Sequence, residues 1–220
     1  MSFSNQVLRP FLQTLSKYGR RNALYINARF YTYRELQQEI SKIRSAVHSI
    51  PQCNVGLVAN NDLATYASIW ALWLEGKSYV PLHPGQPLGR CLDIVKQVEM
   101  DYILDSGKSS RYSDMQVIMT ACLDSDIPNI ESIEDVSDTN FAYILFTSGS
   151  TGTPKGVPLT RSNLSGFVEA FNAQDYKLGP EDRCLQMFDL TFDLSVQSFL
   201  MPLLSGACVY TVPYGTLKYN

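Results

Sequence analysis

Residues 141–156 have the sequence Phe141-Ala142-Tyr143-Ile144-Leu145-Phe146-Thr147-Ser148-Gly149-Ser150-Thr151-Gly152-Thr153-Pro154-Lys155-Gly156. The first six are all apolar, which predicts a strand buried on both faces. Residues 147–156 are rich in Gly, Ser and Thr and predict a loop. Apolar residues at helical spacing then predict a helix over 160–173. A loop between a buried strand and a helix lies at the carboxyl edge of a parallel sheet, where open α/β folds bind their ligands.

The composition of this loop suits an anion. Glycine lets backbone N–H groups turn inward around a phosphate, and Lys155 adds a compact positive charge. The Walker pattern is excluded because Pro154 precedes the lysine and Gly156 follows it. The dinucleotide pattern is excluded by the glycine spacing 149, 152 and 156. The alternative is a flexible linker, which rarely joins an apolar strand to an amphipathic helix so directly.

The rest of the chain alternates between predicted strands and helices. After an amphipathic opening helix around 7–15, helices are predicted over 33–50, 63–74, 91–98, 160–173 and 192–204. Strands are predicted over 30–33, 54–59, 78–82, 102–104, 117–119, 141–146 and 207–212. This order predicts an α/β fold with a largely parallel sheet flanked by helices.

Composition limits the classes of protein. The chain has 220 residues, is 45% hydrophobic and 11% aromatic, and carries a net charge of −3. These values predict a packed core and argue against a generic nucleic-acid binder. No apolar run approaches the roughly 20 residues that span a bilayer. The N-terminus does not resemble a secretory signal. Five cysteines without a C-x-x-C pair predict reduced, mostly buried thiols in a cytoplasmic protein, and no metal-ligand pattern is apparent.

Residues 143–157 resemble the signature loop of the adenylate-forming, AMP-binding enzymes. This family contains acyl-CoA synthetases, luciferases and the amino-acid adenylation domains of non-ribosomal peptide synthesis. Three further segments resemble family elements in the expected order: Tyr31-Thr32-Tyr33-Arg34-Glu35-Leu36, Tyr79-Val80-Pro81-Leu82-His83-Pro84 and Phe192-Asp193-Leu194-Ser195. His83 stands where adenylation domains usually have Asp. The last segment also resembles that of D-alanine–carrier protein ligases.

The resemblance implies a two-step ligation. A carboxylate attacks the α-phosphate of ATP and expels pyrophosphate, and the acyl adenylate then passes to a phosphopantetheine thiol of a carrier protein or to CoA. Mg²⁺ would arrive with the nucleotide rather than in a metal site of the chain. The implied ligands of the ATP phosphates are Thr147, Ser148, Gly149, Ser150, Thr151, Gly152 and Lys155.

Asp193 indicates the class of substrate. In amino-acid-activating relatives the Asp of F-D-x-S pairs with the substrate's α-ammonium, and each charge offsets the other's desolvation. The alternative is that Asp193 caps a helix, a place that Asp favours. Asp189 lies four residues earlier and could take either role, although Ser195 favours Asp193 in the motif.

The resemblance assigns residues 1–220 to the first part of the family's large N-terminal domain. The later motifs of that domain and the whole C-terminal domain, with its catalytic lysine, have no counterpart here. We therefore expect the 220 residues to be inactive alone and to self-associate through unpaired sheet edges and apolar surface. Two alternatives remain: a fragment of an acyl- or aryl-acid CoA ligase, and a non-catalytic nucleotide-binding or interaction module. The identity of the activated acid is not encoded in these residues.

Overall fold

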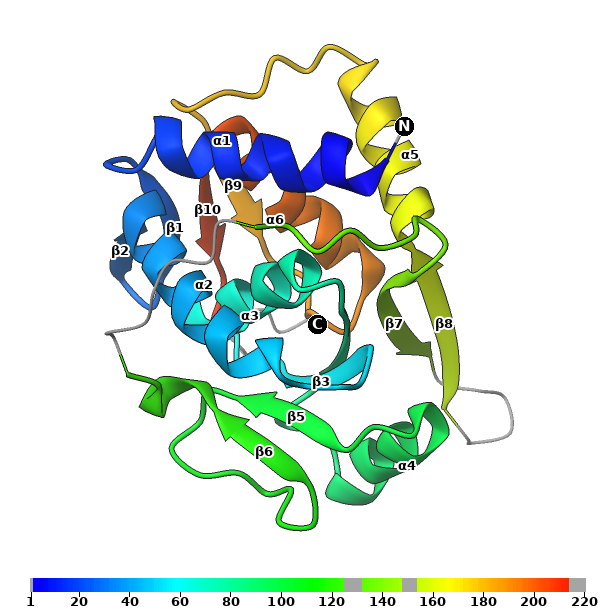
Figure 1. The fold of residues 1–220 in the computed structure, drawn as a ribbon. Coiled ribbons are helices and arrows are strands. Elements are labelled where there is room, and N and C mark those ends of the chain that lie inside the picture. Colours follow the sequence, from blue (N-terminus) through cyan, green and yellow to red (C-terminus); the bar gives the residue numbers. More distant parts are fainter. Residues whose placement is uncertain (1, 125–131, 148–153, 214–220) are drawn as a thin grey trace, which may run out of the picture.

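The computed structural model describes residues 2–124, 132–147 and 154–213. They form two sheets, with helices between the sheets and on their outer faces (Figure 1). The predicted α/β class with mostly parallel strands is confirmed. The strands form two sheets, however, where the sequence pattern predicted one.

The larger sheet has six strands in the order β6-β5-β3-β4-β7-β8. All neighbouring pairs are parallel except β7 and β8, which form an antiparallel hairpin. The strands are β3 (Asn54–Val58), β4 (Ser78–Leu82), β5 (Tyr102–Asp105), β6 (Gln116–Met119), β7 (Phe141–Thr147) and β8 (Lys155–Thr160). Four successive residues of β7, from 142 to 145, are buried, as the apolar run predicts.

The smaller sheet has the order β2-β1-β10-β9. Its strands are β1 (Asn22–Ile26), β2 (Arg29–Thr32), β9 (Arg183–Gln186) and β10 (Cys208–Thr211). β1, β10 and β9 are parallel, and β2 pairs antiparallel with β1. Asn27 and Ala28 join that hairpin with φ values of 49° and 62°, the positive values that a tight two-residue turn needs.

Two helices connect the sheets. α3 (Leu63–Leu74) packs on β3 and β4, and α6 (Asp193–Ser205) packs on β9 and β10. α3 is buried on nearly all sides, so it lacks an amphipathic pattern. The ring of Phe199 on α6 lies 5.7 Å from that of Tyr66 and 6.2 Å from that of Trp73, both on α3. The main apolar core therefore lies between the two sheets.

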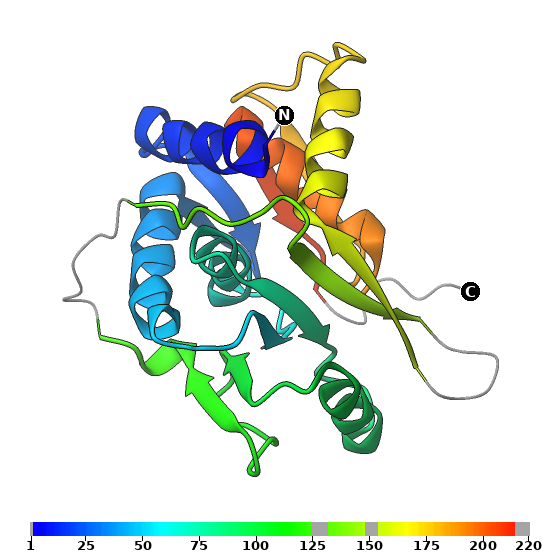
Figure 2. The ribbon, with the colours of Figure 1, turned by 45° about the vertical axis from the view of Figure 1, so that its right-hand side comes forward.

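The remaining helices pack around the sheets, and α4 (Leu88–Val98) lies apart from the others (Figure 2). The N-terminal segment forms a π-helical turn, η1 (Ser4–Leu8), and α1 (Arg9–Lys17), and the Phe11 ring stacks on Trp70 at 3.5 Å. α2 (Tyr33–His48) begins with a capping box between Thr32 and Glu35. α4 supplies residues to a second, smaller core. α5 (Arg161–Asn172) and the 3₁₀ turn η2 (Thr120–Cys122) complete the fold.

Three strands were absent from the sequence-based prediction: β1, β8 and β9. β8 matters most, because the loop after β7 returns as an antiparallel strand before α5 begins. Residues 155–158 of β8 are exposed, and Pro158 lies inside the strand, which is typical of an edge strand. Such a strand has no apolar alternation and contains loop-like residues, so periodicity does not reveal it.

Two further expectations have outcomes here. All five cysteines are free thiols, but only Cys91 and Cys208 are buried, while Cys53 and Cys122 are exposed. The expectation of mostly buried thiols was therefore wrong. Within the described part of the chain, no helix combines the length and the apolar character that crossing a membrane requires.

Candidate active site

The carboxyl ends of the parallel strands of both sheets meet at one place. After β3, Asn61 Nδ2 donates to the carbonyl of Val212, just after β10, at 3.1 Å. After β4, His83 Nε2 lies 2.7 Å from Asp189 Oδ2, on the segment between β9 and α6. These contacts join the strand ends of two sheets, which is where a ligand of an α/β fold is expected.

The predicted phosphate loop starts at this edge. Thr147 is the last residue of β7 and pairs in register with Lys155, the first residue of β8. Both residues are exposed. The other predicted phosphate ligands, Ser148, Gly149, Ser150, Thr151 and Gly152, lie outside the described residues. The structure therefore brings together Thr147 and Lys155, the two predicted ligands on either side of the loop. The loop connects the antiparallel strands β7 and β8, whereas the sequence predicted that it leads directly into a helix.

Asp193 lies at the start of α6, on the rim of a cavity of about 200 Å³. Four elements supply its walls: the strands β7 and β8, the helix α5, and the start of α6. The lining residues are Tyr143, Leu159, Asn163, Leu164, Phe167, Asp193, Leu194, Val196 and Gln197. A mostly apolar cavity with one carboxylate can hold an apolar group and a nearby cation.

The hydrogen bonds of Asp193 separate its two predicted roles. Phe192, not Asp193, is the N-cap residue of α6, and no side-chain capping bond is formed there. Among the described residues, the hydrogen bond that Asp193 Oδ1 accepts comes from the N–H of the adjacent Leu194, at 2.8 Å. Within the described residues Asp193 forms no ion pair. The carboxylate therefore accepts one N–H of the first helical turn and has no cationic partner among the described residues.

Asp189 has a different role. Its Oδ1 accepts the backbone N–H and the hydroxyl of Thr191, both at 2.8 Å, and its Oδ2 faces His83. Burial would raise the pKa of Asp189, but the hydrogen bonds from His83 and Thr191 outweigh it and lower the pKa. Asp189 is thus fully occupied in holding the turn before α6, which leaves Asp193 as the available carboxylate.

Tyr143 was not among the residues singled out from sequence. It lies on β7 in the apolar run, and its ring is 5.6 Å from that of Tyr79. Burial, and then the negative charge of Asp193, raise the pKa of Tyr143 to about 12. Tyr143 therefore remains neutral beside the carboxylate. Four residues along an extended strand separate it from Thr147, a distance of about 13 Å.

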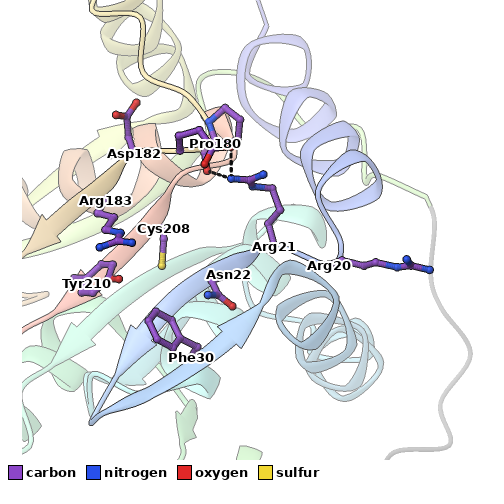
Figure 3. A pocket seen from close by; sticks show the side chains of 10 residues that line it. Arg20, Arg21, Asn22, Phe30, Pro180, Asp182, Arg183, Cys208 and Tyr210 are labelled. Carbon is purple, nitrogen blue, oxygen red and sulfur yellow. Dashed lines mark hydrogen bonds and ion pairs between the residues drawn. The ribbon is translucent and has the colours of Figure 1, made fainter.

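A second hollow, of about 280 Å³, lies at the opposite end of the smaller sheet, around the first residues of β1, β9 and β10 (Figure 3). In it, Arg21 donates to the carbonyl of Pro180 and to Glu181, at 2.8 and 2.6 Å. Arg20 points away from the other labelled side chains. None of the residues predicted from sequence lines this hollow.

Comparisons with known proteins identify the family of the chain. The model of the family described as "AMP-binding enzyme" matches residues 11–219. The chain belongs to this family. Among curated members, FR901469 synthetase of a Dothideomycetidae species is 33% identical over 90% of the chain, and nonribosomal peptide synthetase sidE of Aspergillus fumigatus is 30% identical over 96%. The chain spans only 1% and 10% of these AMP-binding relatives.

Solved structures of the AMP-binding family show the same fold. The Vibrio cholerae adenylation domain AlmE, in complex with glycyl-adenosine-5'-phosphate, is 25% identical, with a TM-score of 0.78 over 94% of this chain and 44% of its own. The N-terminal subdomain of Klebsiella oxytoca NpsA, in complex with 3-hydroxyanthranilyl-AMSN, is 24% identical, with a TM-score of 0.80 over 96% of this chain and 54% of its own. The second likeness concerns the fold alone.

Proposed function

We propose that these residues form the first part of an amino-acid adenylation domain. In the first step an amino-acid carboxylate attacks the α-phosphorus of ATP, an acyl–phosphate bond forms, and pyrophosphate leaves with the electrons of the broken P–O bond. In the second step a thiolate attacks the acyl carbon, a thioester forms, and AMP leaves. Membership of the family and the relatives named as nonribosomal peptide synthetases support this assignment.

The observation that carries the proposal is the position of Asp193. Its carboxylate lies beside neutral Tyr143 on the rim of a mostly apolar cavity and has no cationic partner within the described residues. An α-ammonium group would supply that charge, while the cavity receives the side chain. A substrate without an ammonium group would place its own carboxylate near that of Asp193, with no positive charge between the two.

The phosphates of ATP would bind at the hairpin loop. Thr147 and Lys155 stand at its two ends, about 13 Å along β7 from Tyr143. Mg²⁺ would be held mainly by the nucleotide phosphates. The ammonium would bind beside Tyr143 and the phosphates of ATP at the other end of β7, so that the amino-acid carboxylate, next to its ammonium, faces the α-phosphate between them. Positioning of this kind is what the displacement mainly needs.

The thiol acceptor is proposed to be the phosphopantetheine arm of a carrier protein. The structural relative PA1221 is described as an NRPS protein containing adenylation and PCP domains, at 21% identity. CoA is the alternative acceptor. The C-terminal lysine of the family has no counterpart in these residues, so we expect them to be inactive alone.

The test is amino-acid-dependent pyrophosphate exchange in a polypeptide that carries this segment within a whole adenylation domain. Asp193→Ala is expected to abolish the exchange for every amino acid that the parent activates. Asp175→Ala is the matched control, because it removes a carboxylate that is exposed and does not line the cavity, and it should keep the parent rate.

Three results would overturn the proposal. One is exchange that persists in the Asp193→Ala variant, which would remove the ammonium role. Another is a parent that activates benzoate-type or fatty acids but no amino acid, which would support an acyl- or aryl-acid ligase. The third is binding of ATP without any exchange, which would support a non-catalytic nucleotide-binding module.

A further inference from the structure

Three side chains that are distant in the sequence lie close together at the C-terminal ends of α2 and α3. His48 is the last residue of α2, Glu75 is the C-cap residue of α3, and Glu134 lies on the segment that leads to β7. One ligand atom from each lies within 4.8 Å of the others. His48 Nδ1 is 2.8 Å from Glu75 Oε2.

Glu75 is already oriented for a ligand. Its side chain is 2% exposed, and Arg44, equally buried, donates to Oε1 from Nε at 2.7 Å and contacts it through Nη2 at 2.6 Å. Oε2 is left facing His48. Carboxylates that ligate metals are usually held in this way by a second hydrogen-bonding partner, which fixes their orientation.

A backbone hydrogen bond places Glu134 beside the end of α3. Its N–H donates to the carbonyl of Leu74 at 3.0 Å, at the end of α3. Gly76 has φ +72°, and a Cβ there would lie 2.7 Å from the Val136 side chain. Because Gly76 has no side chain, the segment around 134 can lie directly against the end of α3. These main-chain contacts fix the backbone of Glu134 next to the site, and its exposed side chain extends from there.

The charge at this place favours a cation. Arg44 balances one of the two carboxylates, and the carboxyl ends of α2 and α3 each add a partial negative charge of about half a unit. Lys77 offsets part of this, since its Nζ donates to the carbonyl of Ile50 beyond α2. A net negative charge remains around the three side chains, and a divalent ion would neutralise it.

We propose that His48 Nδ1, Glu75 Oε2 and a Glu134 carboxylate oxygen bind Zn²⁺, with water as the fourth ligand. One imidazole and two carboxylates suit Zn²⁺, whereas Mg²⁺ and Ca²⁺ prefer oxygen ligands alone. The ion takes the place of the Nδ1 proton. Ligand atoms around tetrahedral zinc lie about 3.3 Å apart. The His48 ring must therefore move outward from Glu75 by about half an ångström, and the exposed Glu134 side chain, which starts within 4.8 Å of both, must turn to bring its oxygen to the same spacing. The ring is 60% exposed and has room to do so.

The consequence of binding is structural. The ion would fasten residues 132–136 to the ends of α2 and α3, and so would brace the segment that leads into β7. The site is separate from the cavity beside Asp193 and does not depend on the proposed ligase activity. It requires no ATP and no amino acid to be observed.

The test is calorimetric titration of the whole chain with Zn²⁺, in a Cys53→Ser/Cys122→Ser background that removes the two exposed thiols. One equivalent is expected to bind, and a large excess of Mg²⁺ should not compete. His48→Gln and Glu134→Gln are each expected to weaken binding at least about tenfold, because even the loss of a group that only orients a metal ligand costs about tenfold or more. Asp135→Asn is the matched control, because it removes the same charge from the next, exposed position and should bind like the parent.

Thermal unfolding provides a second readout. Zn²⁺ should raise the midpoint of the parent and of Asp135→Asn but not that of His48→Gln. The substituted positions are exposed, so the metal-free variants should fold normally, and circular dichroism checks this. The proposal is overturned if the parent shows no saturable binding, or if His48→Gln and Glu134→Gln bind Zn²⁺ as tightly as Asp135→Asn.

Discussion

His83 Nε2 lies 2.7 Å from Asp189 Oδ2, and this pair joins the end of β4 in the larger sheet to the turn that precedes α6. The N–H of Gly85 donates to His83 Nδ1 at 2.9 Å, which leaves Nε2 as the nitrogen that donates to Asp189. His83, which stands where the family usually has Asp, thus fixes the turn before α6 through Asp189, four residues before Asp193.

The first prediction concerns the pH dependence of stability. Because the folded-state pKa of Asp189 is lowered, its carboxylate stabilises the fold above the unfolded pKa of about 3.9, and this contribution is lost as the pH falls through the folded value. The urea midpoint of the parent should therefore fall towards that of Asp189→Asn between pH 5 and pH 3. Asp175→Asn, at an 80% exposed side chain, should follow the parent throughout. A constant gap between the parent and Asp189→Asn would contradict the role of this carboxylate.

The second prediction uses two glycines with opposite expected effects. Gly206 ends α6 with φ +82°, and a Cβ there would lie 2.6 Å from the ring of Tyr18. Gly206→Ala should lower the free energy of unfolding by about 1–3 kcal/mol. Gly166 lies inside α5 with nothing near its missing Cβ, so Gly166→Ala should raise it by about 0.5–1 kcal/mol. Urea denaturation measures both, and equal effects of the two substitutions would contradict this account.

The third prediction concerns the phosphate loop. Lys155 is exposed at the start of β8 and, within the described residues, forms no ion pair, so Lys155→Ala should leave the fold intact. Loss of one charge-assisted hydrogen bond should weaken ATP binding by about ten- to a hundredfold. Lys96→Ala, at an exposed position on α4, is the control and should bind like the parent. Unchanged ATP affinity in a folded Lys155→Ala protein, measured by calorimetry, would remove Lys155 from the site.

The fourth prediction concerns self-association. β9 is an edge strand whose Leu185 is 57% exposed, and Phe192 nearby is 63% exposed. An exposed edge with apolar side chains invites pairing with another chain. We expect concentration-dependent association in sedimentation experiments, and Leu185→Lys should reduce it. A parent that stays monomeric at high concentration would refute this.

The helix α3 shows what local sequence can predict. Its bounds, 63–74, were predicted correctly because Asp62 caps its start and Gly76 ends it with a positive φ. β7 was likewise evident from its apolar run. These features depend on neighbouring residues, so the sequence contains them directly. The family, too, is recognisable from contiguous motifs.

The edge strands show why prediction failed elsewhere. β8 and β9 are held mainly by hydrogen bonds to their neighbours, and β8 has few buried side chains. Their conformation therefore follows from the strand beside them and not from their own pattern. For the same reason the division of the strands into two sheets was not foreseen.

The sequence by itself determined the class of fold and the family, and it predicted the phosphate loop and the candidate carboxylate Asp193. Only the tertiary structure decided that Asp189 is bound to His83, that Tyr143 stands beside Asp193, and that His48, Glu75 and Glu134 meet. The physical reason is that hydrogen bonds and charge pairs act over a few ångströms in space. Residues far apart in the chain come within that range only when the two sheets pack against α3 and α6.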